Sequence, residues 1–165
     1  MRFPKLSDQL LLKRLEPPAG KMRMVLDTDT YNKVDDQFAL TYAIKSREKI
    51  HLEAVYAAPF HNERSKSPEE SMELSYDEIL KILGMLNVDP KNFAYKGSTN
   101  YLKNVNEPEE SDAVRDLIKR AMESDDDDPL YVVAIGAITN IASAMLIEPE
   151  IIRKVVVVWL GGNAL

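Results

Sequence analysis

The sequence predicts an α/β fold, an open and mainly parallel sheet flanked by helices on both sides. Two observations predict it. Apolar segments typical of strands alternate along the chain with segments of helical periodicity. The later strand segments are apolar on both faces, which is typical of parallel strands covered by helices. In such a sheet, residues that follow the carboxyl ends of strands face the ligand crevice.

The expected elements can be placed one by one. Residues 1–20 are interpreted as an N-terminal arm, because Pro17, Pro18 and Gly20 interrupt the chain before the first strand, and residues 21–165 form the domain. Strands are expected over residues 22–26, 52–58, 93–95, 130–135 and 155–160. Helices are expected over residues 35–44, 68–86, 111–122 and 138–146, with Ser111 as a helix N-cap.

Composition restricts the classes of function. The chain has 165 residues, a net charge of -6 and no cysteine. The negative charge argues against nucleic acid as a partner, and the lack of cysteine excludes disulfides, thiolate metal sites and thiol nucleophiles. The longest strongly apolar run, residues 155–160, is far shorter than a membrane helix requires. A soluble cytoplasmic protein without membrane or nucleic-acid partners is therefore expected.

Four carboxylates converge on one predicted loop. Asp27 and Asp29 directly follow the first strand, and Asp35 and Asp36 open the next helix. Crowded carboxylates repel one another, and a bound cation is the commonest relief. Oxygen ligands without cysteine favour calcium or magnesium over zinc. The alternative without a metal is that these side chains cap the helix and the loop amides.

Two other functions fit part of this pattern. Phosphohydrolases of the haloacid dehalogenase type also place two aspartates, one residue apart, after their first strand, as nucleophile and acid/base. That motif usually has Thr or Val at the position of Tyr31, and Asp35 and Asp36 would have no role in its mechanism. A magnesium-dependent phosphohydrolase is thus one alternative. A ribose- or nucleoside-binding protein without catalysis is the other.

The stretch from Val25 to Leu40 resembles the N-terminal signature of the inosine-uridine-type nucleoside hydrolases, in which an apolar strand, two aspartates and a short loop lead to an aspartate pair. The family's loop usually contains Pro-Gly, whereas residues 30–34 replace it here. Two later turns are also similar to the family: residues 134–140, which contain Gly136 and Thr139, and residues 158–163, which end in Gly161, Gly162 and Asn163. Three matches in sequence order are more specific than any one.

The resemblance implies a nucleoside hydrolase-like, Rossmann-like fold and hydrolysis of the N-ribosidic bond of nucleosides by a calcium-activated water. It implies that Asp29 is the catalytic base and a metal ligand, with Asp36 and the Thr139 carbonyl as further ligands of Ca²⁺. Asp35, Asn62 and Asn163 would bind the substrate, and Asp27 would support the loop. The small-molecule partner would be a nucleoside. Family members are commonly dimers or tetramers, which makes a homo-oligomer one option, but the sequence leaves the oligomeric state open.

Family members usually have about twice this length, and their C-terminal half supplies a further metal ligand and groups for the ribose and the leaving base. We therefore expect a truncated chain, which by itself hydrolyses nucleosides poorly. The preferred base does not follow from these residues.

Overall fold

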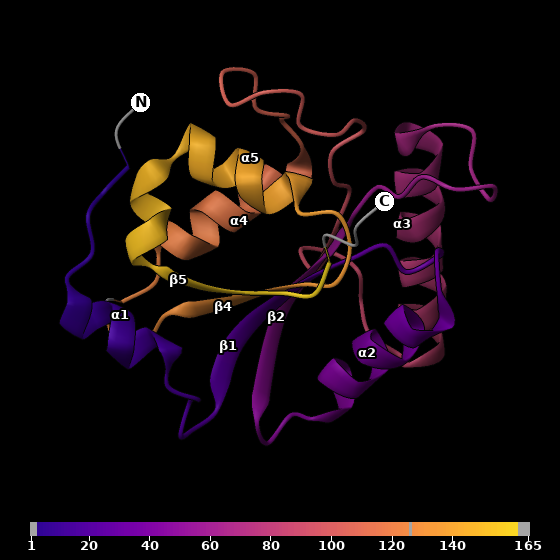
Figure 1. Ribbon diagram of the computed structural model, residues 1–165. Helices are drawn as coiled ribbons and strands as arrows, with labels where there is room; N and C mark the ends of the chain where they lie inside the picture. The colour runs from indigo at the N-terminus through magenta and orange to yellow at the C-terminus, as the bar shows by residue number, and fades with distance from the viewer. Residues whose placement is uncertain (1–2, 126, 162–165) are drawn as a thin grey trace.

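The computed structural model describes residues 3–125 and 127–161. Strands and helices alternate after a short N-terminal helix (Figure 1). The strands are β1 Met22–Thr28, β2 Ile50–Ala57, β3 Ala94–Tyr95, β4 Leu130–Ala134 and β5 Val155–Trp159. The helices are α1 Asp8–Leu15, α2 Val34–Lys45, α3 Pro68–Met85, α4 Asp112–Met122 and α5 Thr139–Ile147, followed by the 3₁₀ helix η1 Pro149–Arg153.

The five strands form one sheet in the order β3-β2-β1-β4-β5, and every pairing is parallel. This confirms the expected open parallel sheet. The order places β1 at the centre, between β2 and β4. Asp27 of β1 stands beside Tyr56 on one side and Ala134 on the other. The chain leaves all three strands at the same edge, so the segments that follow them meet there.

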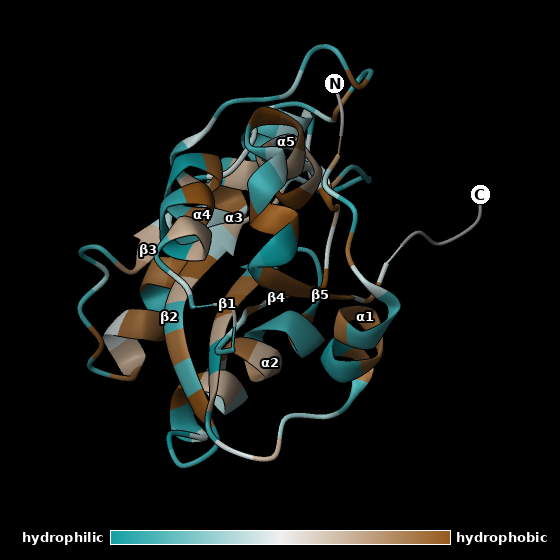
Figure 2. Cartoon of the chain, turned by 90° about the vertical axis from the view of Figure 1, so that its left-hand side faces the viewer, coloured by the Kyte–Doolittle hydropathy of each residue, from teal (hydrophilic) through white to brown (hydrophobic). Residues whose placement is uncertain are grey.

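Helices cover both faces of the sheet. On one face, Val114 and Leu117 of α4 and Ile141 of α5 pack with Val25 and Val132 of the strands. On the other, residues of α2 and α3 pack with Leu26 and Val55. Figure 1 shows these two helical layers on either side of the strands, and Figure 2 shows that β5 is mostly hydrophobic whereas hydrophilic and hydrophobic residues alternate along part of β2. The core therefore consists of two apolar layers separated by the sheet.

Local sequence explains where several helices begin. The hydroxyl groups of Ser67 and Ser111 accept backbone hydrogen bonds from the third residue beyond them, at the start of α3 and α4. Ser111 is thereby confirmed as an N-cap. The N-terminal arm contains α1, which lies beside η1, where Arg14 Nη2 donates to the carbonyl of Arg153 at 3.2 Å.

Three aromatic side chains on the predicted helix and strand are exposed to solvent. Phe38 and Tyr42 lie on the expected helix, yet both side chains are 70% exposed. Their spacing places them on the side of α2 opposite Leu40 and Ala43, which are buried. β5 is an edge strand, and its last residue, Trp159, is 46% exposed.

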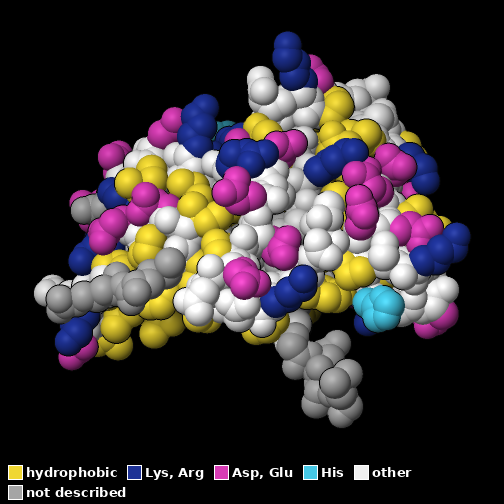
Figure 3. All heavy atoms as spheres, turned by 90° about the horizontal axis from the view of Figure 1, so that it is seen from above, with side chains coloured by type: hydrophobic (Ala, Val, Ile, Leu, Met, Phe, Trp, Pro, Cys, Tyr) yellow, Lys and Arg dark blue, Asp and Glu magenta, His cyan; other side chains and the backbone are white. Residues whose placement is uncertain are grey.

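The surface carries charges of both signs. Figure 3 shows acidic and basic side chains intermingled over the face seen from above. No helix among residues 3–125 and 127–161 combines the length and the apolar character needed to cross a bilayer.

Candidate active site

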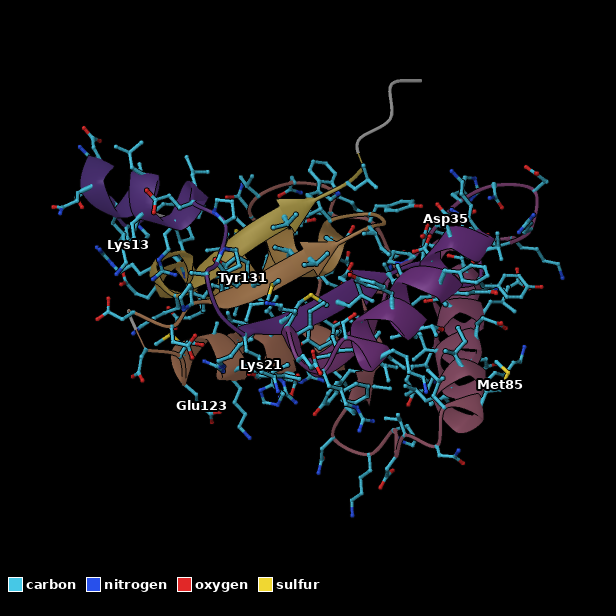
Figure 4. The ribbon with its side chains drawn as sticks, turned by 90° about the horizontal axis from the view of Figure 1, so that it is seen from below. Lys13, Lys21, Asp35, Met85, Glu123 and Tyr131 are labelled. Carbon is cyan, nitrogen blue, oxygen red and sulfur yellow. The ribbon has the colours of Figure 1, made fainter. Side chains whose placement is uncertain are left out.

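A cleft of about 780 Å³ opens where the chain leaves the central strands. Asp29, Asp35 and Asp36 line one part of it, and Gly136 and Thr139 line another. Figure 4 labels Asp35 at the amino end of α2, where the loop from β1 arrives. The parallel order of β1 and β4 brings these two segments together although more than 100 residues separate them in sequence. The structure thus gathers four of the predicted site residues, Asp29, Asp35, Asp36 and Thr139, around one cleft.

Asp29 and Asp36 are in direct contact through a hydrogen bond between their carboxyl groups. Both are buried, with 7% and 5% of their surface exposed. Burial raises the pKa of both groups, and that of Asp36 reaches about 6, although Thr28 Oγ1 donates to Asp36 Oδ1 at 2.5 Å. Two carboxyl groups this close repel each other once both are ionised.

Asp27 lies behind the cleft and is fully buried. Its Oδ2 accepts a hydrogen bond from Asn140 Nδ2 at 2.7 Å, while its Oδ1 has no partner among the described atoms. Burial raises the pKa of Asp27 to about 7. Asn140 Oδ1 in turn accepts from the backbone and hydroxyl of Ser98, both at 2.8 Å. Asp27 therefore joins β1 to α5 and to the loop after β3.

Two glycines allow close approaches here. A Cβ atom on Gly136 would lie 3.1 Å from Asp29 Cγ, so the turn after β4 passes directly against this carboxylate. A Cβ atom on Gly97 would lie 1.9 Å from the carbonyl oxygen of Ala57 and would also contact Asn140. Gly97 cannot be replaced without a shift of backbone, whereas a methyl group at Gly136 would require Asp29 to move by a few tenths of an ångström.

The loop after β1 follows a path that the sequence did not reveal. Asn32 Nδ2 donates to Asp29 Oδ2 at 2.8 Å, and Tyr31 stacks on Phe60 with ring centroids 6.4 Å apart. Asn62, expected to contact ribose, instead donates from Nδ2 to Asn32 Oδ1 at 2.7 Å and is not among the cleft-lining residues. Its neighbour His61 does line the cleft.

The remaining predicted residues are placed as follows. Thr139 begins α5, is buried and lines the cleft. Asn163 lies outside the described residues. Lys33, Tyr101 and Trp159 also line the cleft, and Trp159 Nε1 donates to the Gly136 carbonyl at 3.1 Å. The sequence indicated Lys33, Tyr101 and Trp159 only weakly: each lies close to a predicted site residue or in a segment that follows or ends a strand.

The cleft residues offer oxygen atoms, the ligand type that cations such as calcium prefer. Asp29 and Asp36 offer carboxylate oxygens, and Thr139 lines the same cleft. Calcium takes six to eight oxygens in proteins, and within the described part of the chain no three acidic or histidine side chains gather around a single point. The described residues therefore provide part of a coordination shell, and solvent, substrate or further protein groups would have to provide the remainder.

Comparison with known proteins places these features in a family. The family model for "Inosine-uridine preferring nucleoside hydrolase" matches residues 24–165. No curated protein matches the chain. Among solved structures, a "Purine-Preferring Ribonucleoside Hydrolase from Gardnerella vaginalis" is similar, with 24% sequence identity and a TM-score of 0.64. That match covers 86% of this chain and 49% of the other, so the chain spans about half the length of this solved relative.

The likeness to the solved structure supports the fold, and the family model covers the cleft residues from Asp29 to Gly161. On this match the chain belongs to the inosine-uridine preferring nucleoside hydrolase family.

Proposed function

We propose that this cleft hydrolyses the N-ribosidic bond of nucleosides with a calcium-activated water, giving ribose and a free base for purine and pyrimidine salvage. The observation that carries the proposal is the contact between Asp29 and Asp36 in a cleft at the carboxyl end of the central strand. A family match over residues 24–165 supports the class of substrate.

The reaction needs a base for water and groups that hold the sugar. Cleavage of an N-ribosidic bond passes through an oxocarbenium-like sugar, as glycoside hydrolysis does. Calcium, when bound, would supply positive charge that orients a water molecule and lowers its pKa. Asp29 would accept the proton of that water, since burial raises the pKa of this carboxyl and makes it a stronger base than an exposed aspartate.

Other residues of the cleft take distinct roles in the proposal. Asp36 and the carbonyl of Thr139 would bind the metal beside Asp29. Asp35 is exposed at the cleft and would accept hydrogen bonds from ribose hydroxyls. Asp27 would act from behind, because its bond to Asn140 fixes the strand end that carries Asp29. Gripping the sugar in this way lets binding energy favour its distorted form.

A single-turnover assay with inosine and with uridine tests the proposal. High protein concentration is needed, because the described residues complete only part of the metal shell. We expect release of free base in the presence of calcium, and loss of this release with a chelator or in Asp29→Ala. An Asp29→Ala variant that retained the unsubstituted rate would overturn the role of this carboxylate. Riboside binding without any base release would favour a binding protein.

A further inference from the structure

The loop between β1 and α2 is tied to Asp29 by one residue, Asn32. Its side chain donates to Asp29 Oδ2 at 2.8 Å, and its backbone N–H donates to the carbonyl oxygen of Asp29 at 2.7 Å. Asn32 lies in residues 30–34, the segment that differs from the usual family loop. A residue of this unusual loop therefore sets the position of the carboxylate at the centre of the candidate site.

The segment after β2 holds Asn32 in turn. Asn62 Nδ2 donates to Asn32 Oδ1 at 2.7 Å, and Arg64 Nη1 donates to the Asn32 carbonyl at 2.7 Å. Asn62 Oδ1 accepts from the backbone N–H of Arg64 at 2.9 Å, so the orientation of the Asn62 amide is itself determined. The stacked rings of Tyr31 and Phe60 join the same two segments.

These bonds determine which way the Asn32 amide faces. An amide oxygen accepts and an amide nitrogen donates, so a donor from Asn62 requires Oδ1 of Asn32 on that side. The Nδ2 group is then directed at Asp29. Without Asn62, the Asn32 amide would be free to rotate and would hold the carboxylate less firmly.

We propose that Asn62 is a positioning residue, which orients the Asp29 carboxylate through Asn32 for binding of a divalent cation. The inference rests on the proposed function in one respect, the role of Asp29 as a metal ligand. It assigns to Asn62 a role outside the cleft, in place of a direct contact with ribose. Arg64 assists by holding the backbone of Asn32.

The effect is expected to be that of an outer-shell hydrogen bond on a metal ligand. Asn32 engages Oδ2 of Asp29 and thereby restricts rotation of the carboxylate about its Cβ–Cγ bond. Removing such partners commonly lowers metal affinity by about 10-fold to 100-fold. The ligand itself remains in place, so affinity falls without being abolished.

The test compares Asn62→Ala with the unsubstituted chain by calcium titration calorimetry and by hydrogen exchange of residues 30–34. We expect calcium affinity to fall by about 10-fold and exchange of the loop to accelerate. Asn104→Ala is the matched control, because this exposed asparagine does not line the cleft and belongs to no bond of this relay, so both readouts should stay unchanged. Asn62→Asp is a second variant of nearly identical size, whose carboxylate cannot donate to Asn32.

A double variant adds a specific check. If Asn62 acts through Asn32, then Asn32→Ala alone and Asn32→Ala with Asn62→Ala should weaken calcium binding to the same extent. Additive losses would overturn the relay. So would an Asn62→Ala variant with unchanged calcium affinity and loop exchange but weaker binding of a riboside, because that result assigns Asn62 to the sugar.

The outcomes also separate this inference from the proposed function. If the unsubstituted chain bound no calcium, the proposed metal site would be contradicted, and the hydrogen exchange of residues 30–34 would decide the relay alone. Faster exchange in Asn62→Ala and Asn62→Asp would support it. Unchanged exchange in both folded variants would overturn it.

Discussion

The acidic side chains at the two ends of the sheet differ in whether they have a cationic partner. Toward the amino end of β1, Glu53 accepts from Arg23 Nε at 2.6 Å, and Asp116 accepts from Arg120 Nε at 2.6 Å. At the carboxyl end, Asp27 and Asp36 are buried with raised pKa values and without a salt bridge to any described residue. Loss of one partner from a buried ion pair is costly because the other charge is left unpaired, whereas acids buried without a cation lower stability and keep their capacity to bind one.

Replacing Asp29 gives the largest expected effect. Asp29→Asn keeps an acceptor for Asn32 but removes the negative charge, so we expect base release to fall by roughly 10³-fold, equivalent to about 4 kcal/mol in the barrier. Thermal unfolding should stay unchanged or occur at higher temperature, since burial disfavours the charge that is removed. Asp77→Asn on the exposed side of α3 serves as the control. A large loss of stability in Asp29→Asn would mean that both ends of the sheet use their acids structurally.

Replacing Glu53 should have the opposite signature. Glu53→Gln leaves Arg23 and Arg120 without their shared carboxylate, and we expect the free energy of unfolding to fall by about 3 kcal/mol. Glu150→Gln is the control, because its ion pair with Arg153 is exposed and should contribute no more than about 0.5 kcal/mol. Denaturant titration measures both changes. Equal effects of the two substitutions would show that burial does not strengthen the inner pair.

The close contact between Gly97 and the Ala57 carbonyl should make position 97 sensitive to substitution. In Gly97→Ala the new methyl group meets the Ala57 carbonyl, so the backbone must move away from Asn140. We expect a loss of about 2 kcal/mol in stability by denaturant titration. Gly84→Ala is a suitable comparison, because nothing lies within 4 Å of a Cβ atom there. A Gly97→Ala variant as stable as the native chain would contradict the close packing of this loop.

The last prediction concerns pH, and its effect is the smallest when expressed per pH unit. The pKa of Asp27 is raised from 3.8 to about 7, so between about pH 4 and pH 7 the folded state holds a proton that the unfolded state has released. Stability should therefore decrease as the pH rises through this window, by at most about 1.4 kcal/mol per pH unit for one carboxyl. Asp27→Asn should reduce this slope in unfolding experiments with a chelator present, and Asp36 accounts for part of what remains. An unaltered slope would place the ionisation elsewhere.

Periodicity predicted the fold well because strand and helix patterns are local. The alternation of elements, the parallel sheet and the capping role of Ser111 all follow from residues near one another in sequence. The grouping of Asp29, Asp36 and Thr139 was predictable for a related reason, since each follows or precedes a strand end. The apolar spacing over residues 35–44 indicated a helix but not which of its faces is buried, and Phe38 lies on the exposed one.

The supports of the site could not be predicted in the same way. The bond from Asn62 to Asn32 depends on how two loops lie in space, and nothing in the spacing of amides encodes it. Asn140 lies in the turn at residues 134–140, yet its partners Ser98 and Asp27 are distant in sequence. Such contacts depend on tertiary packing, whereas the carboxylate motif is visible in a short stretch of sequence.

Asn140 also has a consequence for how the chain reaches its native state. Its side chain joins Ser98, Ala57 and Asp27, which precede it by 42, 83 and 113 residues. Such distant partners meet only after β1, β2 and β4 have assembled, and contacts of this kind slow folding because long loops must close first. A refolding chain should thus acquire its central strands before it acquires a competent cleft, and recovery of cation binding should lag behind recovery of secondary structure.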